Sequence, residues 1–312
     1  MGVFSDVGVK LTQEAGLSLL ITGGTGFVGQ ALVKRLGDQP VRLANRADSA
    51  GWHSVLVGIT TVVHLAARVH VMDDTAVDPL AAFRAVNVVG TLNLARQAAA
   101  AGVKRFVFVS SVKVNGEFTQ AGLAFTEADA PDPQDAYGVS KYEAELGLRQ
   151  LAVDTGMEVV IIRPPLVYGP GVKANFATLM HAVQRGWPLP LGAVHNQRSL
   201  VALDNLVDFI VTCITHPQAA NQTFLVSDGH DLSTTELVRG MARAAGVPAR
   251  LLPVPVWALQ AGAALLGKGD AVQRLCGNLQ VDISKARSLL GWVPPVSVDE
   301  GLRRAAAGVQ KT

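Results

Sequence analysis

Hydrophobic residues in the first half of the chain occur in short runs that alternate with segments of helical periodicity. A continuous apolar run predicts a buried strand, whereas apolar residues three and four positions apart predict a helix. This alternation, without an internal repeat, predicts a Rossmann-type α/β fold in which a doubly wound parallel sheet is covered on both faces. The predicted strands span residues 17–22, 41–44, 61–66, 105–111 and 158–163.

The pattern changes after residue 166, where turns rich in proline and glycine separate shorter helices. Apolar runs at 198–204 and 223–226 are expected to return to the main sheet. The chain would therefore form a dinucleotide-binding domain and a smaller, discontinuous substrate-binding lobe, with the substrate in the cleft between them. The domain takes residues 1–166 and 199–226, and the lobe takes residues 167–198 and 227–312.

The composition is that of a compact α/β protein with a small-molecule partner. Of the 312 residues, 49% are hydrophobic and 5% are aromatic, which is typical of a packed rather than a disordered chain. A net charge of +2 and a pI of 8.6 are too mild for a nucleic-acid-binding surface, and no Lys/Arg run forms a polybasic patch. We therefore expect no nucleic-acid partner.

The cysteines and the apolar segments bear on the compartment. Cys213 and Cys276 lie far apart without metal-binding spacing, which favours packing residues in a reducing cytosol and no metal site. Charged residues interrupt segment 1–16, so it lacks the apolar core of a signal peptide. The run at 254–267 is shorter than the about 20 residues that span a bilayer, and we expect a buried helix there. These features predict a cytoplasmic protein without membrane insertion.

A glycine-rich turn follows the first predicted strand. Residues 22–29 read Thr-Gly-Gly-Thr-Gly-Phe-Val-Gly, which fits both G-x-G-x-x-G and T-G-x-x-G-x-x-G. Glycines let the backbone turn tightly and let a pyrophosphate approach the N-terminus of the next helix, where free N–H groups favour an anion. A glycine-rich turn without a ligand is the alternative, but the flanking strand and helix favour a dinucleotide site.

The end of the second predicted strand bears on which dinucleotide binds. Asn45 and Arg46 follow that strand, and no acid occurs before Asp48. Because an acid at this point holds the ribose 2′-OH and an arginine favours a 2′-phosphate, we favour NADP(H), with NAD(H) possible. Only about 15 residues lead to the next strand, too few for a full helix and strand. The shortened segment 47–60 predicts a reduced sheet edge and a shallow adenine pocket.

Polar side chains near the predicted carboxyl edge of the sheet are candidates for proton transfer. Tyr137 and Lys141 are one helical turn apart, so they would share one face of a helix. A nearby ammonium favours the phenolate and would bring the tyrosine pKa closer to neutrality. Ser110 and Ser111 end a predicted strand, where ligands bind in doubly wound folds. Taken alone, the Tyr–Lys spacing also fits a solvated helix start.

In combination these motifs resemble the extended short-chain dehydrogenase/reductase superfamily, in its nucleotide-sugar epimerase/dehydratase branch. The likeness covers nearly the whole chain in the right order. The motifs are Thr22-Gly-x-x-Gly-x-x-Gly29, His64-Leu-Ala-Ala67, Asn87-Val-x-Gly-Thr91, Val109-Ser-Ser-x-x-Val-Asn-Gly116, Tyr137-x-x-x-Lys141, Arg163-Pro-x-x-Val-Tyr-Gly-Pro170 and Arg198-Ser-Leu-Val-x-Leu-Asp-Asn205. More narrowly, the chain is similar to bacterial O-antigen and capsule enzymes that act at C4 of UDP-linked 2-acetamido sugars, through Ala67-Arg-Val-His-Val-Met72, Lys113-Val-Asn-Gly116 and Gly171-Val-Lys-Ala-Asn-Phe176.

The resemblance implies a catalytic set and a cofactor site. Tyr137 would be the acid/base at the sugar C4 oxygen, and Ser111 would hydrogen-bond the same oxygen. Lys141 would bind the nicotinamide ribose and lower the tyrosine pKa, while Asn87 would hold the architecture near that lysine. The implied cofactor-binding residues are Thr22, Gly23, Gly26, Phe27, Val28, Gly29, Asn45, Arg46, Leu65, Ala66, Ala67, Asn87, Tyr137, Lys141 and Pro164.

The resemblance also implies a substrate site. Arg68, His70 and Lys113 would line the sugar pocket beside Ser111, although charged loop residues are as often simply solvated. Asn175 and Arg198 would contact the nucleotide diphosphate, since a guanidinium fits phosphate oxygens bidentately. Asn115 stands where many relatives carry a tyrosine, which is expected to alter the shape of the pocket.

The function implied by this resemblance is that of an NAD(P)-dependent oxidoreductase at C4 of a UDP-linked 2-acetamido hexose. We expect a reductase of a UDP-4-keto-6-deoxy sugar in O-antigen (lipopolysaccharide) precursor synthesis. The alternative is a UDP-sugar 4-epimerase with tightly held NAD, and a more remote one is a non-catalytic NADP(H)-binding sensor. The resemblance further implies a homodimer through the helices at about 78–101 and 137–154.

Overall fold

A six-stranded parallel sheet forms the centre of the protein. The structure is a computed structural model and describes residues 17–44, 51–69, 78–265, 267 and 269–309. The strand order is β2-β1-β3-β4-β5-β8, and every neighbouring pair is parallel, which confirms the predicted fold class. The chain reverses its direction of travel across the sheet between β1 and β3, the usual ligand-binding point in such folds. The strands are β1 (Leu19–Thr22), β2 (Val41–Ala44), β3 (Thr61–His64), β4 (Arg105–Val109), β5 (Glu158–Arg163) and β8 (Thr223–Leu225).

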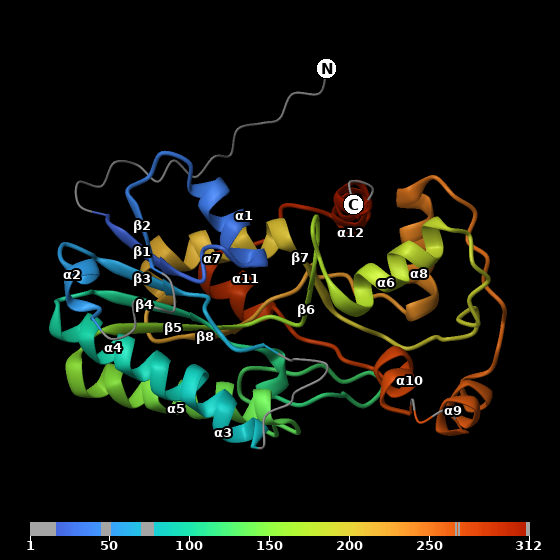
Figure 1. Cartoon of the computed structure of the whole chain (residues 1–312), viewed down its shortest axis with the longest axis horizontal. Coiled ribbons are helices and arrows are strands. Elements are labelled where there is room, and N and C mark those ends of the chain that lie inside the picture. Colours follow the sequence, from blue (N-terminus) through green and yellow to red (C-terminus); the bar gives the residue numbers. More distant parts are fainter. Residues whose placement is uncertain (1–16, 45–50, 70–77, 266, 268, 310–312) are drawn as a thin grey trace.

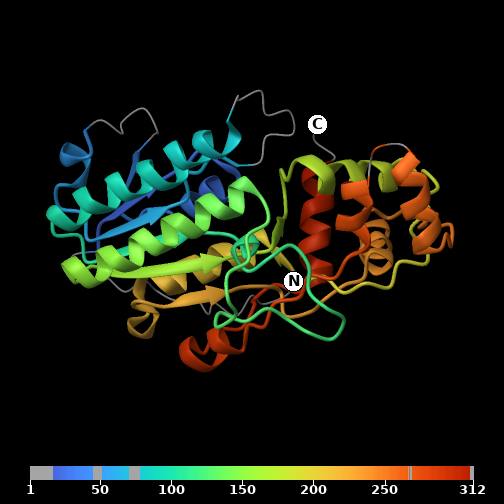
Figure 2. The same ribbon diagram turned by 90° about the horizontal axis from the view of Figure 1, so that it is seen from below.

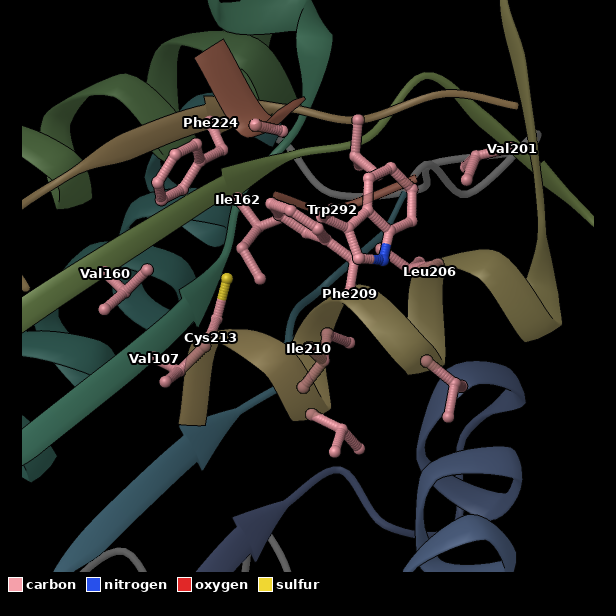
Figure 3. Packing of buried hydrophobic residues seen from close by; sticks show 14 of the residues in the cluster. Val107, Val160, Ile162, Val201, Leu206, Phe209, Ile210, Cys213, Phe224 and Trp292 are labelled. Atoms are coloured by element: carbon pink, nitrogen blue, oxygen red, sulfur yellow. The ribbon is translucent and has the colours of Figure 1, made fainter. Parts of the chain in front are cut away.

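Each face of the sheet has its own hydrophobic core, because successive strand residues point to opposite faces. Leu19 and Ile21 of β1 belong to one core, whereas Leu20 belongs to the other. In Figure 3, Phe209 and Cys213 of α7 (Leu203–Thr215) pack against residues of β4 and β5 in the first core. Burial on both faces explains why the strands are apolar throughout rather than alternating.

Helices cover both faces of the sheet (Figure 1). The face beside β1 residues Leu19 and Ile21 is covered by α1 (Phe27–Leu36), α7 and α11 (Ser284–Leu290). The opposite face is covered by α2 (His53–Leu56), α4 (Thr91–Ala100) and α5 (Ala136–Thr155). The four-residue α2 is all the helix that the described residues contain between β2 and β3, so β2 forms a sheet edge, as the short connection predicts.

The helical stretch expected from residue 78 to residue 102 contains a local irregularity. It begins as α3 (Pro79–Arg84), where the Asp78 side chain caps the helix by accepting from the Ala81 N–H. It then passes through a π-helical turn, Ala85–Gly90, before continuing as α4. Asn87 lies in this turn and is buried, as is common for π-turns at functional sites.

A smaller lobe follows the main sheet in the second half of the chain. A separate two-stranded sheet, β6 (Leu166–Tyr168) with β7 (Leu200–Ala202), connects the lobe to the sheet, and Tyr168 belongs to the lobe's core. The lobe's helices are α6 (Ala174–Gln184), α8 (Thr234–Ala245), α9 (Val256–Leu265), α10 (Gly269–Cys276) and α12 (Val298–Val309).

Two segments lie elsewhere than the sequence predicts. The run at 198–204 does not join the main sheet, because β8 takes the free edge of β5 and β7 pairs with β6 instead. Residues 283–292, expected in the lobe, pack beneath the main sheet through Ala286, Leu290 and Trp292.

The expectation of a buried helix at 254–267 is wrong for most of the side chains of α9. Trp257 is 72% exposed and Leu265 is 89% exposed, whereas Ala263 is buried. Apolar residues occur nearly all round this helix, but only part of its surface is covered, by α10 and, through Val256 and Leu259, by the core of the lobe. No helix in the described part of the chain is long and apolar enough to cross a membrane.

A loop between β4 and α5 reaches from the main sheet to a C-terminal segment (Figure 2). Phe125 exchanges backbone hydrogen bonds with this segment, donating to Gln280 O at 2.8 Å and accepting from Asp282 N at 2.8 Å. The N–H of Thr119 donates to Asn278 O at 3.0 Å. The loop therefore links the carboxyl end of β4 to the segment that follows α10.

Candidate active site

The glycine turn is built for close approach of the backbone to a ligand. Gly23 has φ +72°, and an added Cβ would lie 2.7 Å from the Ala66 nitrogen. A Cβ on Gly29 would lie 2.1 Å from the Gly23 carbonyl oxygen. Gly26 caps α1 without a side-chain hydrogen bond, so the first N–H groups of the helix receive no side-chain partner from this cap. This cradle fits the pyrophosphate of a dinucleotide.

Gly29→Ala is expected to weaken dinucleotide binding by about 100-fold or more, because the turn must open to accept the methyl group. Fluorescence titration with NADPH and with NADH measures the effect. Gly262→Ala is the matched control, since its Cβ would meet nothing within 4 Å. Unchanged affinity in a folded Gly29→Ala protein would contradict the assignment of this turn to the cofactor.

The buried side chain of His64, at the end of β3, links the end of β1 to the first residue of α4. His64 hydrogen-bonds the Thr22 hydroxyl through Nδ1 at 2.6 Å and the Thr91 hydroxyl through Nε2 at 2.9 Å. Burial, with the positive charge of Lys141, lowers the pKa of His64 to about 3, so the imidazole is neutral. Leu65 and Ala66 also donate their N–H groups to Thr22 oxygens. The neutral ring thus holds the glycine turn against the segment after β3.

Tyr137 and Lys141 lie in the first turns of α5, which Asp135 caps by accepting from the Gly138 N–H at 2.7 Å. The Lys141 ammonium lies 5.9 Å from the centroid of the Tyr137 ring. The same ammonium donates to the Val109 carbonyl at 2.8 Å and lies 4.4 Å above the Phe108 ring. The two residues lie one helical turn apart, as their spacing predicts, and the structure places them at the carboxyl end of β4.

The electrostatics of the pair differ from the expectation that Lys141 lowers the tyrosine pKa. Burial and then the negative charge of Asp135 raise the pKa of Tyr137 well above its usual value. Burial lowers the pKa of Lys141 to about 7, while Glu145 opposes that change. Without a ligand the phenol is therefore firmly protonated, and the lysine titrates near neutrality.

Ser111 follows β4 and begins the 3₁₀ turn Val112–Val114, with its Oγ accepting from the Lys113 N–H at 3.2 Å. Because the backbone fills one acceptor position, the hydroxyl hydrogen remains able to donate elsewhere. A Cβ on Gly138 would lie 2.9 Å from the Lys113 carbonyl oxygen, so this turn packs tightly on the first turn of α5. The structure thus brings the Ser111 turn against the helix that carries Tyr137.

Asn87 joins two parts of the site. Its side chain accepts from Arg68 N at 2.8 Å and donates to Arg68 O at 3.0 Å, which fixes the backbone after β3. It also donates to the Ser140 hydroxyl at 3.0 Å, and Ser140 donates to the Tyr137 carbonyl. The predicted architectural role for this residue therefore has a direct structural basis.

An aromatic ring links the Arg68 side chain to Tyr137. Phe83 of α3 meets the Tyr137 ring edge-on at 6.0 Å, and the Arg68 guanidinium lies 5.4 Å from the Phe83 centroid. The sequence reasoning placed Arg68 near the sugar but missed Phe83, which read only as an apolar helix position.

A buried ion pair that the sequence reasoning missed supports the carboxyl ends of β4 and β5. Arg163 pairs bidentately with Glu145, at 2.9 and 2.6 Å, and both side chains are almost fully buried. Glu145 also accepts from the Ser110 hydroxyl at 2.6 Å. Asn115 accepts from Arg163 at 2.9 Å and donates to the Thr126 carbonyl, so it supports the loop structurally. The spacing of four from Lys141 to Glu145 was the signal that could have revealed this pair.

The remaining predicted residues have different surroundings. Asn175 is exposed at the second position of α6. Arg198 donates to the Gly277 carbonyl at 3.0 Å, and burial lowers the pKa of its guanidinium despite the negative charge of Glu117. Pro164 accepts from the Val112 N–H at 3.0 Å. Asn45, Arg46 and His70 lie outside the described residues, whereas Phe27, Val28 and Ala67 follow the glycine turn and β3 as expected.

The fold and the site define a class: a Rossmann-type enzyme with the Ser, Tyr and Lys constellation of a short-chain dehydrogenase/reductase. The chain belongs to the NAD dependent epimerase/dehydratase family, whose model matches residues 19–227. It is thus an NAD(P)-dependent enzyme of the extended type, in a family of nucleotide-sugar epimerases and reductases.

Relatives and solved structures agree with this family. The chain is 53% identical to a UDP-glucose 4-epimerase from Vibrio cholerae over 309 residues, covering 93% of this chain and 94% of that protein. The structure of RMD from Pseudomonas aeruginosa complexed with NADPH has a TM-score of 0.76 at 22% identity, covering 95% and 99% of the two chains. UDP-glucose 4-epimerase from Thermotoga maritima with UDP-glucose has a TM-score of 0.75 at 24% identity, with the same coverage.

Proposed function

We propose that the protein reduces the 4-keto group of a UDP-linked 2-acetamido-6-deoxy hexose with a nicotinamide dinucleotide. The observation that carries this proposal is the position of Tyr137 at the carboxyl end of β4, with the Lys141 ammonium beside its ring and the Ser111 turn packed on the same helix. A reduction needs a proton donor at the moment when the ketone becomes an alkoxide, whereas an oxidation needs a base. The phenol is protonated at neutral pH, and the ammonium beside it stabilises the phenolate that remains, so Tyr137 can act as the donor.

The residues have complementary tasks in this reaction. A bound dihydronicotinamide supplies the hydride. Tyr137 gives its proton to the C4 oxygen, and the Ser111 hydroxyl donates a hydrogen bond that stabilises the developing charge. The ammonium of Lys141, buried beside the phenol, stabilises the negative charge of the phenolate that remains. The glycine turn holds the pyrophosphate, and Asn87 fixes the strand end against α5.

We infer the cofactor preference, and the release of the cofactor after each turnover, from the edge of the sheet at β2. Because β2 is an edge strand with only the short α2 between it and β3 in the described residues, we infer a shallow adenine side from which the dinucleotide exchanges at each turnover. Arg46 in the sequence supports NADPH over NADH. An exchanging cofactor fits a reductase, because an epimerase keeps its dinucleotide through both hydride transfers.

A 4-epimerase of UDP-linked hexoses is the second candidate. The name of the Vibrio cholerae relative favours it, since that protein is 53% identical over nearly the full length of both chains. The same Ser, Tyr and Lys would serve both hydride transfers of an epimerase with tightly held NAD⁺. The retained proton machinery makes a dinucleotide sensor without catalysis the weakest alternative.

The test is mass spectrometry of products from a panel of UDP-sugars and their 4-keto-6-deoxy derivatives, each with NAD⁺, NADH or NADPH. We expect a 4-keto substrate to gain two hydrogens while an equal amount of reduced dinucleotide is consumed. NAD⁺ that remains bound through purification, with UDP-GlcNAc converted to UDP-GalNAc without added cofactor, would instead establish the epimerase.

We also propose a homodimer that pairs the outer faces of the α3–α4 segment and α5. Val89 is 64% exposed on the π-turn and Val153 is 81% exposed on α5, so apolar side chains remain uncovered on both elements. Pairing of two copies through these faces would cover both side chains.

A further inference from the structure

Lys113 lies at the centre of a small ionic cluster beside the catalytic helix. Its ammonium forms ion pairs with Asp135 and, at 3.0 Å, with Glu117. The side chains of Lys113 and Asp135 are 29% and 26% exposed, so water screens this pair only partly. The sequence reasoning placed Lys113 in the sugar pocket, whereas here its charge is engaged by carboxylates of the protein.

Asp135 uses its two carboxylate oxygens for different partners. Oδ1 accepts from the Gly138 N–H at 2.7 Å and so caps α5. Oδ2 accepts from the Lys113 ammonium. The cap of the helix that presents Tyr137 is therefore held by a side chain from the turn that presents Ser111.

The backbone of Lys113 makes the same connection a second time. Its N–H donates to the Ser111 Oγ at 3.2 Å, which orients the hydroxyl. Its carbonyl oxygen faces Gly138, where an added Cβ would approach to 2.9 Å. One residue thus contacts the serine hydroxyl, the helix cap and the first turn of the helix.

We infer that Lys113 is a positioning residue: by clamping Asp135, it sets the Ser111 turn against Tyr137 and neutralises the carboxylate that caps the catalytic helix. This inference rests on the proposed function, because it concerns the same proton transfer. The role differs from that of a sugar ligand, since Lys113 acts through Asp135 and not on the substrate.

Neutralisation matters because, among the residues that the structure describes, few charges face the phenol. Lys141 faces Tyr137 from its own helix, Asp135 faces it from the cap, and Arg68 approaches through the Phe83 ring. Farther along, Arg84 of α3 is occupied by Glu143 of α5, and Glu145 is occupied by Arg163. Asp135 raises the pKa of Tyr137, so loss of its cation would raise that pKa further.

The experiment compares pH profiles of five variants, one of them a control, at saturating dinucleotide. Lys113→Met is expected to lower kcat between about 10-fold and 100-fold. It should also shift the basic limb of the profile up by about one pH unit, because the unpaired carboxylate of Asp135 favours the protonated forms of both Lys141 and Tyr137. Asp135→Asn keeps an oxygen for the cap and should shift the same limb down. Lys113→Arg should retain the wild-type profile.

The double variant Lys113→Met/Asp135→Asn separates the two possible roles of Lys113. If Lys113 neutralises Asp135, removing both charges should return the limb to within a few tenths of a pH unit of wild type. A sugar ligand would instead give a raised KM with unchanged kcat in Lys113→Met, without recovery in the double variant, and this would overturn the inference. So would a wild-type profile in folded Lys113→Met.

Arg84→Met is the matched control, because Arg84 and Glu143 form another ion pair on α5, with side chains 48% and 30% exposed. It should leave the limb where it is in wild type, and a shift as large as that of Lys113→Met would contradict a specific role. Failure of the proposed function is separately visible: the wild-type enzyme would then reduce no 4-keto sugar, whereas failure of this inference leaves wild-type turnover intact.

Discussion

Tyr137→Phe is expected to lower turnover of the 4-keto substrate by about 10³-fold while dinucleotide affinity stays within a few-fold of wild type. The substitution removes the only atom that gives the proton, and it keeps the ring that packs edge-on against Phe83. Steady-state rates with NADPH, together with fluorescence titration of NADPH binding, measure the two quantities on the same preparation.

Tyr142→Phe is the control for this experiment, because Tyr142 is half-buried on the same helix but is not part of the proposed site. It should turn over at nearly the wild-type rate. Turnover that persisted in Tyr137→Phe would exclude the proton role of the phenol. A parallel loss of dinucleotide affinity would show that the phenol serves binding rather than proton transfer.

Glu145→Gln is expected to lower the free energy of unfolding by about 3–5 kcal/mol, because it leaves the Arg163 guanidinium buried without a carboxylate. Four groups meet at Glu145, since Ser110 and Arg149 bond to it as well as both arms of Arg163. Urea denaturation with and without NADPH measures the loss. Because the same carboxylate stands behind Lys141 and the end of β4, we also expect lower turnover.

Asp299→Asn is the comparison for stability, since Asp299 pairs with Arg243 on the surface of the lobe, away from the proposed dimer, with side chains 78% and 66% exposed. An exposed pair contributes about 0–1 kcal/mol, so this variant should unfold close to wild type. Equal losses in the two variants would mean that the burial of the Glu145–Arg163 pair has no special weight.

The parts of the candidate site that the sequence predicted are those that depend on local patterns. The glycine turn, Tyr137 and Lys141 each depend on spacing along one strand, turn or helix, and such spacing is readable without a fold. The parallel sheet followed from apolar runs alternating with helical segments, since burial on both faces demands such runs. The end of a predicted strand singled out Ser111, and the resemblance added the role of Asn87.

The features that the sequence did not predict depend on contacts between distant segments. The pairs Glu145–Arg163 and Lys113–Asp135 join residues 18 and 22 positions apart, and their partners are chosen only once the strands and α5 are assembled. The net electrostatics of Tyr137 depend on its burial, which no motif encodes. Likewise, apolar content predicted a buried α9, although the depth of a helix depends on what surrounds it.

The π-helical turn at Ala85–Gly90 sets how far α4 is rotated relative to α3 about their common axis. With 3.6 residues per α-helical turn, each inserted residue rotates everything that follows by about 100° about the axis. The helical segment before the turn can therefore aim Phe83 at the catalytic tyrosine while the segment after it aims Leu94 into the sheet's core. In a chain shortened by one residue here, either Phe83 could face Tyr137 or Leu94 could face the core, but the rotation of the helix would no longer allow both.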